Sequence, residues 1–314
     1  MPDTLMQRLF SKQRGTNPEL PFACMSLNAL VFLDPASYAA KLQAIFGADQ
    51  VAVLPAPDKF SPAILTLRAG PLLLLAFQGT SNWPTWARYF TSAGAKPFGP
   101  SPGVCFAPFV DAANAVQPAI GSALQDGDQV LFTGHSLGAA IAGMLNSNYT
   151  RAGLNTQAAW LFACPRFGDP AFFAAVKGQN LTLNLAADPV PYLPPDVWQI
   201  IQRGPDELRW EQIYERFAAS LFLPPWEPVA RAPERLDFLV QLAAANLDWS
   251  QSPHNTYQYI RAAWSIAAKS PTLAMLSLNA LITQLGLWNP WPTSSAEFAG
   301  ESLASAKTVL DLPR

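Results

Sequence analysis

Residues 130–143 read VLFTGHSLGAAIAG: an apolar run, the pentad GHSLG at 134–138, and a run of small residues. The apolar run predicts a buried strand and the small residues predict a helix, so the pentad lies on the turn between them. Its two glycines suit a turn so sharp that a Cβ at either place would strike the strand or the helix. Ser136 then sits on a strained backbone with its hydroxyl exposed. The stretch predicts a nucleophilic serine; the alternative is a glycine-rich turn with an ordinary exposed serine.

The candidates for a base are few, because the chain has only two histidines, His135 and His254. A serine needs a positioned imidazole to take up its proton at neutral pH. The turn is expected to point His135 away from the serine hydroxyl. If the chain carries a Ser-His-acid site, His254 is therefore the base. The alternative is a polar surface histidine.

The carboxylate has to be chosen from 22 acidic residues. In enzymes with this type of elbow the acid lies between the serine and the histidine in the chain, here within 136–254. Asp188 follows the alternating apolar stretch 181–185, so we expect it at the carboxyl end of a strand, on the same sheet edge as the elbow. Asp196 follows the same proline-rich loop and is the fallback. Asp169 is typical of a helix N-cap instead.

A second oxyanion donor is expected after an earlier buried strand. Residues 71–77, PLLLLAF, are the most hydrophobic run in the chain and predict such a strand. The run leads into Gln78-Gly79-Thr80-Ser81, where the glycine lets the backbone approach a ligand closely. The amides of Thr80 and Leu137 would then converge on the oxyanion. A Gly-Thr pair alone is as typical of an ordinary strand-ending turn.

Five motifs in a fixed order extend this pattern. They are Phe77-Gln78-Gly79-Thr80 with a following Trp86, the pentad with Ala139, Pro165-Arg166-Phe167-Gly168-Asp169-Pro170, Asp188-Pro189-Val190-Pro191 and His254-Asn255-Thr256-Tyr257. Together they resemble the class 3 lipases, the α/β-hydrolase group that includes the filamentous-fungal triacylglycerol lipases. The resemblance spans about residues 20–265. One departure is Gln78, which stands where the family usually has arginine.

The resemblance implies an α/β-hydrolase fold, with a mostly parallel central sheet and helices on both faces. It implies Ser136 as nucleophile, Asp188 as acid, His254 as base, and Thr80 and Leu137 as oxyanion donors. The implied activity is that of a serine carboxylester hydrolase, a lipase that cleaves acylglycerol esters through an acyl-enzyme without a cofactor.

Other readings of the same residues stay open. Phospholipase A1, feruloyl-type esterase and acyltransferase chemistry share the acyl-enzyme, so the motifs do not separate them. A non-catalytic lipid-binding protein that retains the fold is a third class.

Residues 82–93 are rich in aromatic side chains, including Trp83, Trp86 and Phe90. In the resembling lipases a short mobile lid occupies this position. Aromatic side chains prefer a cleft or a lipid surface to water, so a transient contact with a lipid–water interface is expected. The alternative is that Trp83 and Trp86 are core residues beneath the oxyanion loop.

The composition of the chain limits which partners, metal sites and membrane segments are expected. Half of the 314 residues are hydrophobic, 13% are charged and the net charge is −2, so nothing favours a nucleic-acid partner. Two histidines exclude a His-rich metal site, and three scattered cysteines make a disulfide framework unexpected. No uninterrupted run of 18 apolar residues exists, so we expect no transmembrane segment. The chain is expected to be soluble, either cytoplasmic or secreted without a clear signal peptide.

We expect one α/β-hydrolase domain over 1–314, in which 196–250 forms a helical insertion or cap. The stretch 21–33 predicts a buried helix, and the apolar tail after Thr272 predicts a docked helix. Alternation of strands and helices elsewhere favours a parallel sheet covered on both faces. The expected strands are 51–54, 63–67, 72–77, 129–133, 159–163 and 181–187, and the expected helices are 35–46, 110–125 with a kink at Pro118, 137–150 and 170–176.

Overall fold

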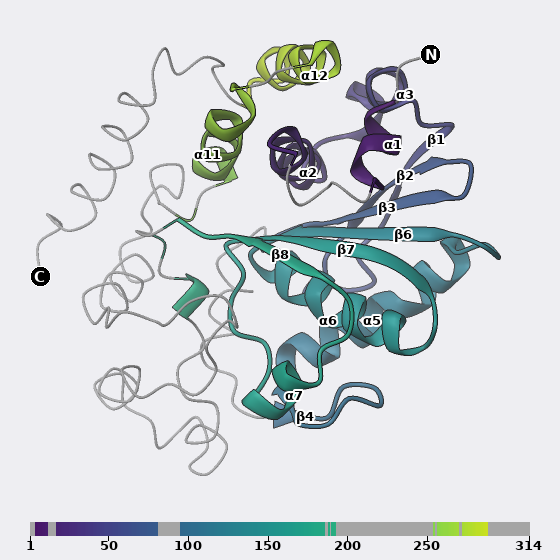
Figure 1. Ribbon diagram of the computed structural model, residues 1–314, viewed down its shortest axis with the longest axis vertical. Coiled ribbons are helices and arrows are strands. Elements are labelled where there is room, and N and C mark those ends of the chain that lie inside the picture. The colour runs from purple at the N-terminus through teal and green to yellow at the C-terminus, as the bar shows by residue number, and fades with distance from the viewer. Residues whose placement is uncertain are drawn as a thin grey trace, which may run out of the picture.

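The computed structural model describes residues 4–11, 17–80, 95–185, 188, 190–192, 254, 256–269 and 272–287. Among them, six strands form one sheet in the order β1-β2-β3-β6-β7-β8 (Figure 1). Strands β1 to β3 pair antiparallel, whereas β3, β6, β7 and β8 pair parallel. The strands are β1 Gln50–Leu54, β2 Ile64–Ala69, β3 Leu72–Phe77, β6 Gln129–His135, β7 Asn155–Phe162 and β8 Asn180–Leu183. Strands β4 (Ala95–Lys96) and β5 (Cys105–Phe106) form a separate small sheet.

Helices cover both faces of the large sheet (Figure 1). Each face has its own cluster of buried apolar side chains, so the core forms two layers on either side of the strands. One face is covered by α1 (Leu5–Leu9), α2 (Glu19–Leu30), α3 (Ala39–Phe46), α11 (Thr256–Ala267) and α12 (Leu273–Gln284), and the other by α5 (Ala107–Ala123) and α6 (Leu137–Arg151). Shorter elements are η2 (Pro35–Ser37), α7 (Pro170–Ala174) and η3 (Val190–Tyr192).

Strand β3 ends beside strand β6, at the same edge of the sheet. It is buried along nearly its whole length because it lies between β2 and β6 and is covered on both faces. Its register pairs Phe77 with Gly134, so β3 and β6 reach the same edge side by side. The segments that follow these strands, Gln78–Thr80 and the elbow at Ser136, therefore leave the sheet together.

Helix α2 is buried on every side, as expected for the stretch 21–33. A helix that is apolar all round is stable only between other elements, and α2 lies between the sheet and α11. Phe22 meets Trp264 of α11 edge to face, with ring centroids 4.9 Å apart. This contact fixes α11, the helix that begins two residues after His254.

The predicted elements are confirmed with shifts at their ends. Strand β6 extends to His135, and β8 ends at Leu183 rather than at 187. The backbone leaves the sheet there because the Asn184 side chain accepts a hydrogen bond from the Cys164 amide, 3.3 Å away. Segment 35–46 divides into η2 and α3, and α5 continues through Pro118. Helix α12 confirms the docked helix after Thr272, whereas α1, α11 and the small sheet were not predicted.

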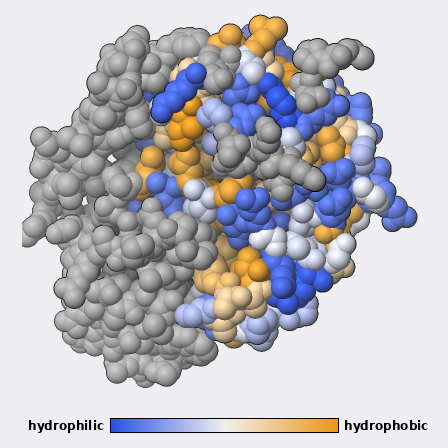
Figure 2. Space-filling model, in the orientation of Figure 1, coloured by the Kyte–Doolittle hydropathy of each residue, from blue (hydrophilic) through white to orange (hydrophobic). Residues whose placement is uncertain are grey.

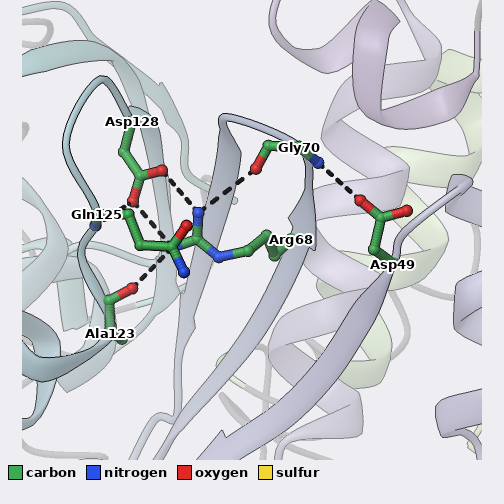
Figure 3. A network of polar contacts seen from close by, with 6 residues as sticks. All are labelled: Asp49, Arg68, Gly70, Ala123, Gln125 and Asp128. Carbon is green, nitrogen blue, oxygen red and sulfur yellow. Dashed lines mark hydrogen bonds and ion pairs between the residues drawn. The ribbon is translucent and has the colours of Figure 1, made fainter.

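At the opposite edge of the sheet, Arg68 of β2 and Asp128 form a bidentate ion pair (Figure 3). The distances are 2.6 Å from Nη1 to Oδ1 and 2.9 Å from Nη2 to Oδ2. Arg68 also donates to the Ala123 carbonyl at 2.7 Å, and Asp128 accepts the Gln125 amide at 2.8 Å. Asp128 directly precedes β6, so the pair ties the end of α5 and the start of β6 to β2.

The surface in view carries hydrophobic residues interspersed among hydrophilic ones (Figure 2). Within the described part of the chain, no helix is both long and apolar enough to cross a membrane. Cys24, Cys105 and Cys164 are all buried free thiols.

Candidate active site

The elbow has the strained geometry that its sequence predicts. Strand β6 ends at His135, helix α6 begins at Leu137, and Ser136 between them has φ 59° and ψ −124°. A Cβ on Gly134 would overlap the backbone of Gly138 in the helix, and a Cβ on Gly138 would overlap the Phe77 carbonyl of β3. Both glycines are therefore required by close backbone approach, one against the helix and one against the neighbouring strand.

Three side chains that lie far apart in the sequence meet at this elbow. His254 Nε2 lies 2.8 Å from Ser136 Oγ, and His254 Nδ1 lies 2.9 Å from Asp188 Oδ2. All three residues are buried, with exposures of 4% for Ser136, 5% for His254 and 0% for Asp188. The expectation of an exposed serine at the elbow is therefore wrong, because the surrounding chain covers Ser136. A carboxylate only accepts hydrogen bonds, so Nδ1 carries the proton and the Nε2 lone pair faces the serine hydroxyl.

Both oxygens of the Asp188 carboxylate are held. Oδ1 accepts the Val190 amide at 2.9 Å, and Oδ2 accepts the Tyr259 hydroxyl at 2.6 Å in addition to His254. Burial, followed by the Asp188 charge and hydrogen bond, raises the pKa of Tyr259 well above its usual 10.0, so the phenol keeps its proton and donates it. Sequence reasoning missed Tyr259, which lies five residues after His254 and outside the recognised motif.

The second histidine lies against the first. The His135 ring is buried and stacks on the His254 ring, with centroids 4.9 Å apart and an interplanar angle of 29°. Burial, with a contribution from the charge of His254, lowers the pKa of His135 well below its usual 6.5. His135 is therefore neutral at pH 7, and it is His254 that reaches the serine hydroxyl.

The segment after β3 passes directly against the elbow. A Cβ on Gly79 would lie 3.0 Å from the His135 carbonyl oxygen and 3.5 Å from Ser136 Cβ. The Gln78 amide donates to the Ala63 carbonyl at 3.0 Å, which fixes the course of this segment next to β2. Thr80 follows at half-buried depth, and Leu137 is the first residue of α6, where helical amides lack partners within the helix.

Asp169 caps α7, as its sequence predicts: its side chain accepts the Phe172 amide at 2.7 Å. Several other predictions lie outside the described residues. These are Trp83, Trp86 and Phe90 of the aromatic segment, the fallback acid Asp196, and the insertion 196–250. Among the described residues, no group of three or more His, Cys, Asp or Glu side chains could hold a metal ion.

A sharp strand–turn–helix with a buried serine, an imidazole and a carboxylate joined by hydrogen bonds lies at the carboxyl edge of parallel strands. Fold and site together define a serine hydrolase of the α/β-hydrolase fold. Residues 74–198 match the family model "Lipase (class 3)", which confirms the resemblance over that part of the chain. The protein is accordingly a serine hydrolase whose residues 74–198 are similar to the class 3 lipases. The matched part contains Thr80, Ser136 and Asp188, whereas His254 lies beyond it.

Solved fungal lipases are among the structures to which the chain is similar, at low sequence identity. Rhizomucor miehei triacylglyceride lipase is 20% identical, with a TM-score of 0.46 over 59% of this chain and 76% of that one. A fungal lipase–inhibitor complex gives 20% identity and a TM-score of 0.48 over the same shares. The lipase of Rhizopus microsporus var. chinensis gives 17% identity and a TM-score of 0.44 over 59% of this chain and 70% of that one. No curated protein sequence matches the chain.

Proposed function

We propose that the protein hydrolyses acylglycerol esters through an acyl-enzyme, with Ser136 as nucleophile, His254 as base and Asp188 as acid. The observation that carries this proposal is the unbroken chain of hydrogen bonds from Ser136 Oγ through His254 to Asp188 Oδ2. The strained backbone of Ser136 supports it independently, because a non-glycine residue keeps a positive φ only where the surrounding structure enforces it.

In the first half-reaction, Ser136 Oγ attacks the ester carbonyl carbon while its proton moves to His254 Nε2. The imidazolium that forms is stabilised by the buried Asp188 carboxylate. The carbonyl oxygen becomes an oxyanion, which in this proposal accepts hydrogen bonds from the amides of Thr80 and Leu137. Collapse of this intermediate expels the alcohol, which takes the proton from Nε2, and leaves the acyl group on Ser136.

In the second half-reaction, water attacks the acyl-enzyme carbonyl and gives one proton to His254 Nε2. The same two amides receive the second oxyanion. When this intermediate collapses, Ser136 Oγ leaves the carbonyl carbon and recovers its proton from Nε2. The products are a free carboxylic acid and the resting enzyme. An alcohol in place of water would give acyl transfer, which is why the acceptor must be measured.

A labelling experiment on the full chain tests the nucleophile. A fluorophosphonate probe should label the wild-type protein stoichiometrically, and Ser136→Ala should abolish both labelling and hydrolysis of p-nitrophenyl butyrate. A protein that neither labels nor turns over this ester would be the non-catalytic lipid-binding alternative. Labelling that persists in Ser136→Ala would move the nucleophile to another residue.

A substrate panel tests the ester class. We expect triglycerides to be cleaved with higher kcat/KM than phosphatidylcholine or a feruloyl ester, and water to be the preferred acceptor. Preference for the sn-1 ester of phosphatidylcholine would favour phospholipase A1 chemistry. Preference for the feruloyl ester, or for an added alcohol as acceptor, would favour the other two alternatives.

The aromatic composition of segment 82–93 supports the proposal that the reaction takes place at a lipid–water interface. This support comes from the sequence alone. The test follows the hydrolysis rate as tributyrin is raised through its solubility limit. We expect a jump in rate at that limit, which Phe90→Ser weakens. A smooth saturation curve for both proteins would contradict the proposal that segment 82–93 opens at the interface.

A further inference from the structure

The Tyr259 hydroxyl lies between a backbone donor and the acid of the site. Its oxygen accepts the Leu185 amide at 3.0 Å, and its proton is donated to Asp188 Oδ2 at 2.6 Å. The chain of hydrogen bonds therefore begins at the backbone after β8 and ends at Ser136. Donors in such a chain polarise one another, so the Leu185 amide makes the phenol a stronger donor to the carboxylate.

Asp188 Oδ2 is shared by two donors, the Tyr259 hydroxyl and His254 Nδ1. Oδ1 is held separately by the Val190 amide. With Oδ1 fixed, the Tyr259 hydroxyl determines how the carboxylate plane is tilted toward the imidazole. It also takes part of the negative charge on the oxygen that stabilises the imidazolium.

Among the described residues, few other ionisable groups face Asp188 and His254. His135 on β6 is held neutral by burial, and burial raises the pKa of the Cys164 thiol, two residues after β7, well above its usual value. Tyr259 on α11 stays protonated. Among the described side chains, those that donate to Asp188 are His254 and Tyr259.

We propose that Tyr259 is a positioning residue that orients Asp188 toward His254 by sharing Oδ2 with the imidazole. The proposal rests on the proposed roles of Ser136, Asp188 and His254. Removal of the hydroxyl leaves more negative charge on Oδ2, which then stabilises the imidazolium more strongly. Loss of the fixed carboxylate plane at the same time lowers turnover, whereas substrate binding is unaffected because Tyr259 is fully buried.

The test compares Tyr259→Phe with Tyr38→Phe. Tyr38 is a buried tyrosine of the same core layer, and its hydroxyl has no partner among the described residues. We expect Tyr259→Phe to lower kcat about tenfold with KM unchanged, the effect of one lost hydrogen bond to a charged group. The acid limb of its kcat/KM profile should move to higher pH. Tyr38→Phe should match wild type in both. An acid limb that stays in place or moves to lower pH would overturn the proposal.

A second measurement keeps the Tyr259 hydroxyl in place and changes only its strength as a donor. Biosynthetic incorporation of 3-fluorotyrosine lowers the pKa of the phenols and makes Tyr259 a stronger donor, so the acid limb should move to lower pH. The same labelling in Tyr259→Phe should produce no such shift, and a shift there would overturn the proposal. Wild-type turnover with an inactive Ser136→Ala establishes the proposed function first. Failure of the Tyr259 shifts in an active, Ser136-dependent enzyme then refutes Tyr259 alone.

Discussion

His135 stacks on His254, with the two ring centroids 4.9 Å apart, so the only two histidines of the chain lie face to face in one buried site. One ring faces the serine hydroxyl and the carboxylate, whereas the other packs beneath it. His135 therefore packs against the imidazole that faces Ser136, and its own ring does not take the place beside the serine hydroxyl.

The two histidines should respond differently to removal. His254→Ala should lower ester hydrolysis on the order of 10⁴-fold, because the serine loses its base. His135→Ala removes the ring that stacks on His254 and its hydrogen bond to the His254 backbone, but no group that reaches the serine hydroxyl, so it should cost far less. Steady-state kinetics on a soluble short-chain ester decides between them. An inactive His135→Ala beside an active His254→Ala would reverse the assignment of the base.

Burial of neutral His135 also predicts a pH dependence of stability. Its folded pKa is lowered below the usual 6.5, so the unfolded state binds the proton first as pH falls. The contribution of His135 to the free energy of unfolding is fully present above about pH 6.5. It is lost as the pH falls toward the lowered pKa, by about 1.4 kcal/mol per pH unit. Urea unfolding at several pH values should show this loss in wild type and a flatter profile in His135→Asn. Parallel profiles would show that His135 is not the group responsible.

Asp188 should be essential for turnover but not for folding. Asp188→Asn removes the charge that orients His254 and stabilises its cation, and a loss on the order of 10⁴-fold is expected. Asp196→Asn, the matched change at the fallback acid, should be mild. Matched circular dichroism spectra ensure that folded proteins are compared. An active Asp188→Asn with an inactive Asp196→Asn would overturn the choice of acid.

Local patterns were sufficient to predict the sheet edge and the elbow. Gly134 and Gly138 lie two residues before and two residues after Ser136, and the apolar run of β3 identifies the strand beside the elbow. Asp188 could be anticipated because it follows a strand at the same edge. Each of these inferences depends on residues within a few positions of one another.

Tyr259 could not be found in the same way. It lies 71 residues from Asp188, and the two meet because α11 packs on α2, a contact made by Phe22 and Trp264. No local pattern distinguishes it from the neighbouring Tyr257. The early end of β8 has the same kind of cause, since the Asn184 side chain and the Leu185 amide find partners on other elements.

The close approach of Gly138 to β3 predicts a sharp loss of activity in Gly138→Ala. The added Cβ would overlap the Phe77 and Gln78 carbonyls and push the segment that leads to Thr80. Displacement by about 1 Å costs on the order of 100-fold in rate. Gly121→Ala is the matched control, because its Cβ would meet nothing within 4 Å in helix α5. Unchanged kinetics in Gly138→Ala would contradict the packing described for the elbow.

Breaking the Arg68–Asp128 ion pair should lower stability without lowering activity, because the pair lies at the sheet edge opposite the site. Asp128→Asn leaves the buried Arg68 charge unpaired and should lower the free energy of unfolding at pH 7 by about 3 kcal/mol. Conditions that keep the variant folded should leave kcat and KM unchanged.

The stabilisation that this ion pair provides should be lost at low pH. Burial tends to raise the pKa of Asp128, but the hydrogen bonds from Arg68 and Gln125 and the Arg68 charge together hold it below its usual 3.8. A lowered folded pKa means that this stabilisation is complete above about pH 4 and is lost as pH falls through the folded pKa. The difference in unfolding free energy between wild type and Asp128→Asn should therefore be constant from pH 7 to pH 5 and shrink below pH 4, measured by urea denaturation. A difference that shrinks already between pH 7 and pH 5 would assign the effect to a group other than Asp128.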